Sequence, residues 1–158
     1  MNLSTNDDQK SEHGDLLFWA TRYFDQKKYQ KSLLIFIKLL HIHADLKCPV
    51  PFIMHNIGIC FYHLKDFENA LKWFSETIQY ISKNHFDFSQ IIISLQSMAQ
   101  TYQDLEDYVH MDIFIHIAKS LTIASTEKST NSKLSLQRLA LFHKLLNFIH
   151  HRNPLDLK

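Results

Sequence analysis

Eleven histidines among 158 residues are the first feature of this chain that could support metal binding or catalysis. His41 and His43 are two residues apart, which places them on different faces of a helix, and His110 and His116, six residues apart, also diverge. No HExxH motif occurs, and no two histidines lie four residues apart beside an acidic partner. The sequence therefore predicts neither a bound metal nor a cofactor.

Other catalytic patterns are also missing from the sequence. It contains no GxSxG motif, no glycine-rich phosphate loop and no Cys-His-Asn arrangement. The acidic residues Asp104, Glu106 and Asp107 fall at an expected turn and are interpreted as a solvated helix junction. His55 and His63 are eight residues apart, near one face of a helix, and are interpreted as surface or groove residues that could hydrogen-bond a ligand. We therefore expect a protein that is not an enzyme.

The composition indicates a single globular, helical domain. Hydrophobic residues make up 46% of the chain and charged residues 21%, and only two glycines and three prolines occur. A net charge of +1 gives no strong attraction to nucleic acid, and no apolar run approaches the roughly 20 residues of a membrane span. The polar N-terminus does not match a secretory signal, and Cys48 and Cys60 form no CxxC pair. We therefore expect reduced, partly buried thiols in a cytoplasmic protein that does not bind nucleic acid and does not insert into a membrane.

Apolar residues recur at helical spacing along most of the chain. The first expected helix has Leu16, Trp19, Ala20 and Tyr23 at positions i, i+3, i+4 and i+7, with Asp15 as its N-cap. Polar turns then divide the chain into three helical hairpins and one last helix. The prediction is a flexible tail at residues 1–13, repeats at about 14–46, 51–84 and 88–125, and a C-terminal capping helix at 131–152, which makes about seven helices.

The three hairpins share one pattern of side chains. A small residue is followed by an aromatic residue three positions later, and by another aromatic residue six positions after that. Small residues are needed where the two helices of a hairpin cross closely, and Met111 is large for this position, so we expect the third hairpin to be splayed or locally repacked. The matching residues are Ala20, Tyr23, Tyr29, Ser32 and Phe36; Gly58, Phe61, Phe67, Ala70 and Phe74; and Ala99, Tyr102, Tyr108, Met111 and Ile115, at intervals of 38 and 41 residues.

These residues resemble the tetratricopeptide repeat (TPR) family from about Leu16 to Ala124. The usual repeat of that family is about 34 residues long, so the second helices here are longer by about a turn, as in its peptide-sensing and motor-adaptor members. The resemblance implies an all-α fold: a right-handed superhelix of three TPR-like hairpins plus a C-terminal capping helix. The architecture is also similar to that of small bacterial secretion chaperones of the TPR type.

In the TPR family the first helix of each hairpin lines a concave groove. Some members bind a chaperone's C-terminal carboxylate through Lys, Arg and Asn, but only Asn56 matches those positions here, so Hsp70- or Hsp90-type tails are not expected. We expect instead an extended or helical partner segment with apolar anchors beside Phe24, Ile59 and Tyr62. Alternatively, Phe24 and Ile59 are core residues or are covered by the N-terminal tail. The expected groove residues are Leu17, Thr21, Phe24, His55, Asn56, Ile59, Tyr62, His63, Gln96, Gln100 and Gln103.

From the TPR resemblance and the groove residues we expect a non-catalytic protein–protein interaction module, an adaptor or a chaperone that holds a partner segment in its groove. One alternative is a structural module that self-associates, for example as a homodimer, through the C-terminal helix. A second alternative is a small-peptide sensor that acts on another protein. The wide apolar stripe of the last helix comprises Leu134, Leu139, Leu141, Phe142, Leu145, Leu146, Phe148 and Ile149.

Overall fold

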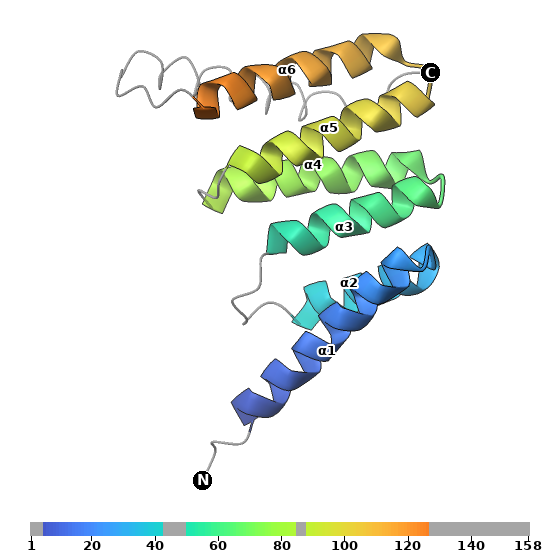
Figure 1. Cartoon of the computed structure of the whole chain (residues 1–158), viewed down its shortest axis with the longest axis vertical. Coiled ribbons are helices and arrows are strands. Elements are labelled where there is room, and N and C mark those ends of the chain that lie inside the picture. The colour runs from blue at the N-terminus through green and yellow to red at the C-terminus, as the bar shows by residue number, and fades with distance from the viewer. Residues whose placement is uncertain (1–4, 43–49, 85–87, 127–158) are drawn as a thin grey trace.

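The computed structural model describes residues 5–42, 50–84 and 88–126, which form six α-helices. Helix α1 packs against α2, α3 against α4, and α5 against α6, so the helices pair as hairpins. The hairpins stack in chain order along the long axis of the molecule (Figure 1). The described residues contain no β-strand, which confirms the all-α prediction. The helices are α1 (Thr5–Asp25), α2 (Tyr29–Ile42), α3 (Val50–His63), α4 (Phe67–Asn84), α5 (Phe88–Asp104) and α6 (Tyr108–Thr126).

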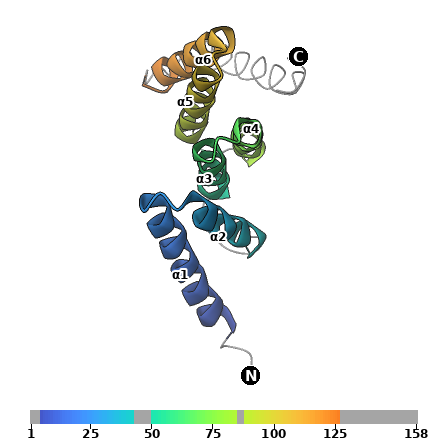
Figure 2. The same ribbon diagram turned by 90° about the vertical axis from the view of Figure 1, so that its right-hand side faces the viewer.

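Each hairpin is held to the next by its second helix, since α2 contacts α3 and α4 contacts α5. The first helices α3 and α5 also touch directly. Figure 2 shows α2 and α4 on the same side of their partners α1 and α3. The first two hairpins therefore share an orientation, and the right-handed superhelix stays a prediction.

The three hairpin turns have the same backbone geometry. One residue in each turn has a positive φ: Lys27 at 58°, Lys65 at 65° and Glu106 at 60°. The amide of each of these residues donates to a carbonyl three positions earlier, and the next amide donates to a carbonyl five positions earlier. This is the Schellman arrangement, which satisfies the last carbonyls of a helix. The turns recur at the sequence intervals of 38 and 41 residues, in agreement with the repeat register.

Aspartates cap the helices that follow two of these turns. Asp66 Oδ1 accepts a hydrogen bond from the Asn69 backbone amide at 3.2 Å, and Asp107 Oδ1 accepts one from the His110 amide at 3.1 Å. Burial by itself would raise the pKa of Asp107, but the hydrogen bonds from the His110 backbone and ring outweigh it and hold that pKa below its ordinary value. Both turns are therefore fixed by local polar contacts.

Two clusters of buried apolar side chains form the core, one across α1, α2 and α3 and one across α4, α5 and α6. At the first crossing, Ser32 Oγ donates a 2.8 Å hydrogen bond to the Ala20 carbonyl, as the small residues predict. Cys60 is a fully buried free thiol 3.7 Å from Ser32 Oγ, and burial raises its pKa to about 11. The reduced thiol predicted for Cys60 agrees with this position, and Cys48 lies outside the described residues.

The third hairpin is packed differently from the other two. Phe36 and Phe74 are fully buried, but the matching residue Ile115 is only partly buried. The preceding residue, Phe114, is buried in its place, with 2% of its surface exposed. Met111 is also only partly buried. This is the local repacking expected from the size of Met111.

The expected start of the first helix at Gly14 is wrong, because α1 begins at Thr5. Most of residues 1–13, expected as a flexible tail, therefore belong to a helix, and Asp15 lies inside α1 rather than at its N-cap. The stretch before Gly14 contains no proline that would stop a helix, and one interior glycine costs only about 1 kcal/mol. The predicted capping helix at residues 131–152 lies outside the described residues.

Gly58 lies where α3 and α4 cross, and a side chain there should destabilise the protein. A Cβ atom at this position would lie 2.6 Å from Cε1 of the Phe74 ring, which is fully buried. We expect Gly58→Ala to lower the free energy of unfolding by roughly 1 to 3 kcal/mol, as overpacking does. Urea denaturation followed by circular dichroism measures the change.

The matched control for this substitution is Gly14→Ala. A Cβ atom at Gly14 would meet nothing within 4 Å, so alanine there should stabilise α1 by about 1 kcal/mol. Opposite signs for the two variants are expected. A stability change of the same sign and size in both would contradict the close crossing at Gly58.

Candidate functional site

The eleven residues predicted to line a groove lie on α1, α3 and α5, the first helices of the three hairpins. The structure brings three of them together: Phe24, Tyr62 and His63. They meet beside the hairpin turns, where α2 and α4 begin. Tyr29 and Phe67 are the first residues of those two helices and complete a group of five rings, which we call the turn-side cluster.

His63 is at the centre of the turn-side cluster. Its ring stacks on Tyr29, with centroids 4.2 Å apart and planes 7° from parallel. Phe24 and Tyr62 approach it edge-on, with centroids 5.8 and 5.3 Å away, and both arrangements are favourable for aromatic rings. Because Phe24 and Tyr29 belong to the first hairpin and the other three rings to the second, the cluster joins the two hairpins.

Asp104, at the end of α5, connects the turn-side cluster to the third hairpin. Its Oδ2 accepts a 2.8 Å hydrogen bond from the Tyr62 hydroxyl, and its Oδ1 accepts a 3.1 Å bond from the Gln100 side chain. The ammonium group of Lys65 lies 3.9 Å from the same carboxylate. Gln103, also a predicted groove residue, is exposed one position earlier. The sequence analysis interpreted Asp104 as part of a solvated helix junction and did not predict its bond to Tyr62, although the repeat register aligns Asp104 with His63.

The surroundings of His63 favour its neutral form. Burial lowers the pKa of His63, and the positive charges of Lys65 and Lys27 lower it further. Burial also raises the pKa of Tyr62, and the hydrogen bond to Asp104 and the charge of that carboxylate act in the same direction. At neutral pH the cluster therefore presents an uncharged imidazole and a protonated phenol, which bind through stacking and hydrogen bonds.

His55 has an internal partner instead of a place in the cluster. Its Nδ1 lies 3.1 Å from Oγ of the buried Ser94 on α5, and its ring centroid lies 5.3 Å from that of Phe74. Burial lowers the pKa of His55 to about 4, so the ring is neutral at physiological pH. This geometry makes His55 a polar link between α3 and α5.

The remaining predicted groove residues on α1 and α3 do not gather at one site. The Thr21 hydroxyl donates to the Leu17 carbonyl at 3.0 Å, and the Asn56 side chain donates to the Phe52 carbonyl at 2.8 Å, each within its own helix. Ile59 packs against the second core cluster. Ile59 is partly buried there, as Phe24 is against the first core cluster, so both residues contribute to core packing.

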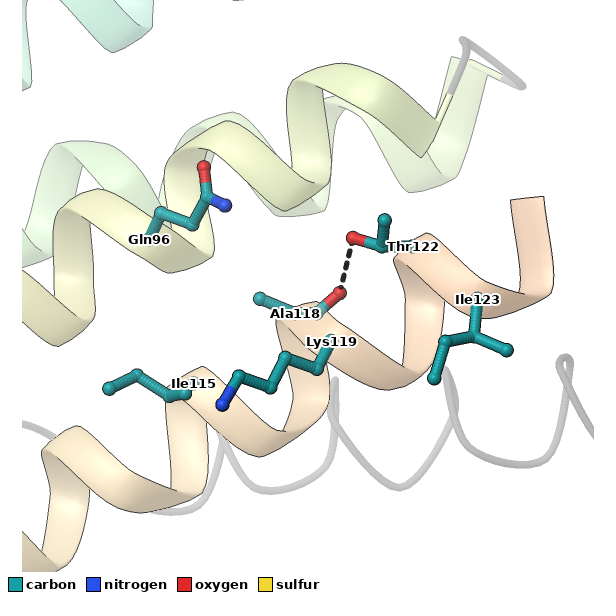
Figure 3. A pocket seen from close by; sticks show the side chains of 6 residues that line it. All are labelled: Gln96, Ile115, Ala118, Lys119, Thr122 and Ile123. Carbon is teal, nitrogen blue, oxygen red and sulfur yellow. Dashed lines mark hydrogen bonds between the residues drawn. The ribbon is translucent and has the colours of Figure 1, made fainter. Parts of the chain in front are cut away.

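Gln96 lines a pocket between α5 and α6 that the sequence pattern did not reveal (Figure 3). Its volume is about 460 Å³. In Figure 3 Gln96 extends from α5, whereas the other lining residues come from α6. The repeat register could have indicated this pocket. Ile115 and Ala118 match Phe74 and Thr77, which are larger and are fully buried in the second hairpin. The lining residues are Gln96, Ile115, Ala118, Lys119, Thr122 and Ile123.

Comparison with known proteins identifies the fold. No protein-family profile matches the chain. The RNA polymerase-associated protein CTR9 of Saccharomyces cerevisiae is 29% identical over 144 residues, which cover 87% of this chain and 13% of that protein. The N-terminal domain of stress-induced protein-1 (STI-1) from C. elegans, a TPR domain, matches with a TM-score of 0.60 at 11% identity, over 84% of this chain and 96% of that domain. The chain has a TPR-like helical repeat fold.

The TPR-like fold confirms the resemblance drawn from the repeated side-chain pattern. Within the described part of this TPR-like chain, no three His, Cys, Asp or Glu side chains gather as metal ligands do. None of its described helices combines the length and the hydrophobicity needed to cross a membrane.

His55 should make the stability of this TPR-like fold depend on acid. The folded protein holds the pKa of His55 at about 4, against an ordinary value of 6.5. Between these two pKa values the imidazole of His55 binds more protons in the unfolded chain than in the folded one. The contribution of His55 to the free energy of unfolding therefore falls as the pH drops through this window, and it is constant above it. The loss from His55 is on the order of 2 to 3 kcal/mol.

We expect His55→Gln, which cannot titrate, to flatten this acid dependence. Urea denaturation of the variant and the parent protein between about pH 4.5 and about pH 7.5 measures the slope. His116→Gln is the matched control, because His116 is exposed on α6, and it should leave the slope unchanged. An equally steep acid slope in His55→Gln would show that His55 is not the group that titrates.

Proposed function

We propose that the chain is a non-catalytic protein-interaction module, an adaptor or a chaperone, that holds a segment of a partner protein along α1, α3 and α5. The TPR-like fold supports the class, because stacked repeat hairpins form extended surfaces that bind other proteins. The turn-side cluster supports the position. It gathers Phe24, Tyr62 and His63 from two hairpins, and this is the observation that carries the proposal.

The turn-side cluster suits an apolar or aromatic anchor of the partner segment. His63 stays exposed although Phe24, Tyr29 and Tyr62 surround it, so a partner side chain can stack on this group of rings. A neutral imidazole is also less costly to bury than a charged one. The exposed Gln103 can pair with the partner's backbone, because its amide both donates and accepts hydrogen bonds. Aromatic anchors beside a polar rim are typical of protein interfaces.

The partner class to seek first comes from the relative. CTR9 is named as RNA polymerase-associated, and this chain matches 13% of its length. RNA polymerase subunits and the proteins bound to them are therefore the first candidates in our proposal. The cytoplasm stays the predicted compartment. The free thiol of Cys60 supports a reducing compartment, which includes both the cytosol and the nucleus.

A charge placed in the turn-side cluster should abolish partner binding. We expect His63→Asp to reduce captured partner at least tenfold, which corresponds to a loss of about 1.4 kcal/mol or more, because an apolar anchor would then have to desolvate a carboxylate. Affinity capture followed by mass spectrometry measures it, with the partner identified first on the parent protein.

The matched control is His116→Asp, the same change at an exposed position of α6. Both variants should keep the helical circular dichroism spectrum of the parent, since both side chains are exposed. Undiminished capture by a folded His63→Asp variant would remove the turn-side cluster from the binding surface. An equal loss of captured partner in both variants would show that the effect comes from the added negative charge and not from its position in the turn-side cluster.

A further inference from the structure

The outer face of α1 carries a stripe of four exposed residues: Asp15, Phe18, Trp19 and Arg22. Their spacing of i, i+3, i+4 and i+7 places them along one side of the helix. Phe18 is 53% exposed and Trp19 is 45% exposed, with ring centroids 5.5 Å apart in an edge-to-face arrangement. The Arg22 guanidinium carbon lies 5.8 Å from both ring centroids, which confirms that the three side chains share a face.

This stripe is separate from the proposed partner-binding surface. Each residue turns an α-helix by about 100°, so Leu17, Thr21 and Phe24 lie nearly opposite the stripe on α1. Ala20, which is fully buried, faces α2 between the two surfaces. Figure 1 shows α1 at one end of the stack, with no described helix beyond it.

The position of Trp19 is one that a neighbouring helix normally covers. Its equivalents in the repeat register, 38 and then 41 residues later, are Ile57 and Met98, which are 0% and 3% exposed. Ile57 is buried in the core cluster that includes α2, and Met98 is buried in the one that includes α4. Since α2 contacts α3 and α4 contacts α5, this burial agrees with cover by the preceding hairpin. The exposed Trp19 therefore marks a helix-packing site that no described helix occupies.

The charges at the two ends of the stripe identify its occupant. Asp15 and Arg22 are seven residues apart, which is about 10 Å along the helix axis. This is too far for an ion pair within one helix, because such pairs form between residues three or four positions apart. An antiparallel helix with the same stripe would bring an arginine to Asp15 and an aspartate to Arg22. The two aromatic residues lie at the midpoint between these charges, so Phe18 would then meet a tryptophan and Trp19 a phenylalanine.

We propose that α1 pairs antiparallel with α1 of a second copy of the chain, about a twofold axis between Phe18 and Trp19. The contact is self-complementary, as a twofold interface requires. Its centre is aromatic and its ends are ionic, which is the composition of a protein–protein hot spot with a charged rim. Because α1 is about 30 Å long and a single helix pair buries less than a standard interface, the dimer is weak, with a micromolar or higher dissociation constant.

Charge exchange tests the pairing. Sedimentation velocity from about ten micromolar to several hundred micromolar protein should show a concentration-dependent dimer for the parent chain. Asp15→Arg alone, or Arg22→Asp alone, places like charges together twice per dimer and should raise the dissociation constant at least tenfold. The double variant carrying both changes restores two opposite-charge contacts and should recover the dimer. Trp19→Ala should abolish it.

Controls separate the pairing from general effects of the changes. Asp112→Arg is the same charge change at an exposed position of α6, and Leu34→Ala removes a side chain that is 60% exposed on α2; neither should alter the dimer. A parent chain that is monomeric at every concentration overturns the proposal. So does a dimer that survives the single charge changes, or a folded double variant that stays monomeric. His63→Asp should leave the dimer intact, so this proposal and the partner-binding proposal can fail independently.

Discussion

The ring of Phe74 lies against the backbone of α3 at Gly58, and the rest of the structure depends on this close approach. It sets the crossing of the central hairpin. The same ring contacts His55, which bonds to Ser94 on α5, so the crossing also positions the third hairpin. Phe61, three residues after Gly58, packs against both core clusters. The central hairpin therefore connects the two halves of the core through a short chain of direct contacts.

The turn-side cluster follows from repetition of the hairpins in one register. Phe24 and Tyr62 occupy equivalent positions of the first two repeats, and His63 and Asp104 occupy the next position of the second and third. Phe24 contacts His63, and Tyr62 bonds to Asp104, so the same contact between neighbouring repeats is made twice with different chemistry. One contact is aromatic and the other is a hydrogen bond. A partner segment that follows the stack would therefore meet an apolar end and a polar end, in agreement with the character of the groove residues.

The sequence predicted those features that depend on local spacing. A small residue at each crossing and an aromatic residue at each turn are read directly from the chain, and they were sufficient for the helical hairpins and the position of the turns. Features that depend on distant contacts were not predictable in this way. The bond between His55 and Ser94, for example, joins residues 39 positions apart. The repacking of the third hairpin was expected from the size of Met111, but the burial of Phe114 instead of Ile115 was not.

Two further misses have local causes. The start of α1 at Thr5 was missed because Gly14 and Asp15 have the chemistry of a helix boundary, while nothing in the preceding residues forbids a helix. The left-handed residues of the turns were missed because they are Lys27, Lys65 and Glu106 rather than glycine. In each case the residue types allow two conformations, and local spacing alone does not decide between them.

The division of the core into two clusters has a consequence for how the molecule opens. The cluster of α1, α2 and α3 and the cluster of α4, α5 and α6 meet at the central hairpin, and we expect each cluster to open as a unit. Fraying of the terminal hairpin formed by α1 and α2 would leave the second cluster folded. We therefore expect the backbone amides of the second cluster to be better protected from hydrogen exchange than those of the first. A ligand that bound rings of α1, α2 and α3 would hold the first cluster together, and so would slow exchange beyond the residues that it touches.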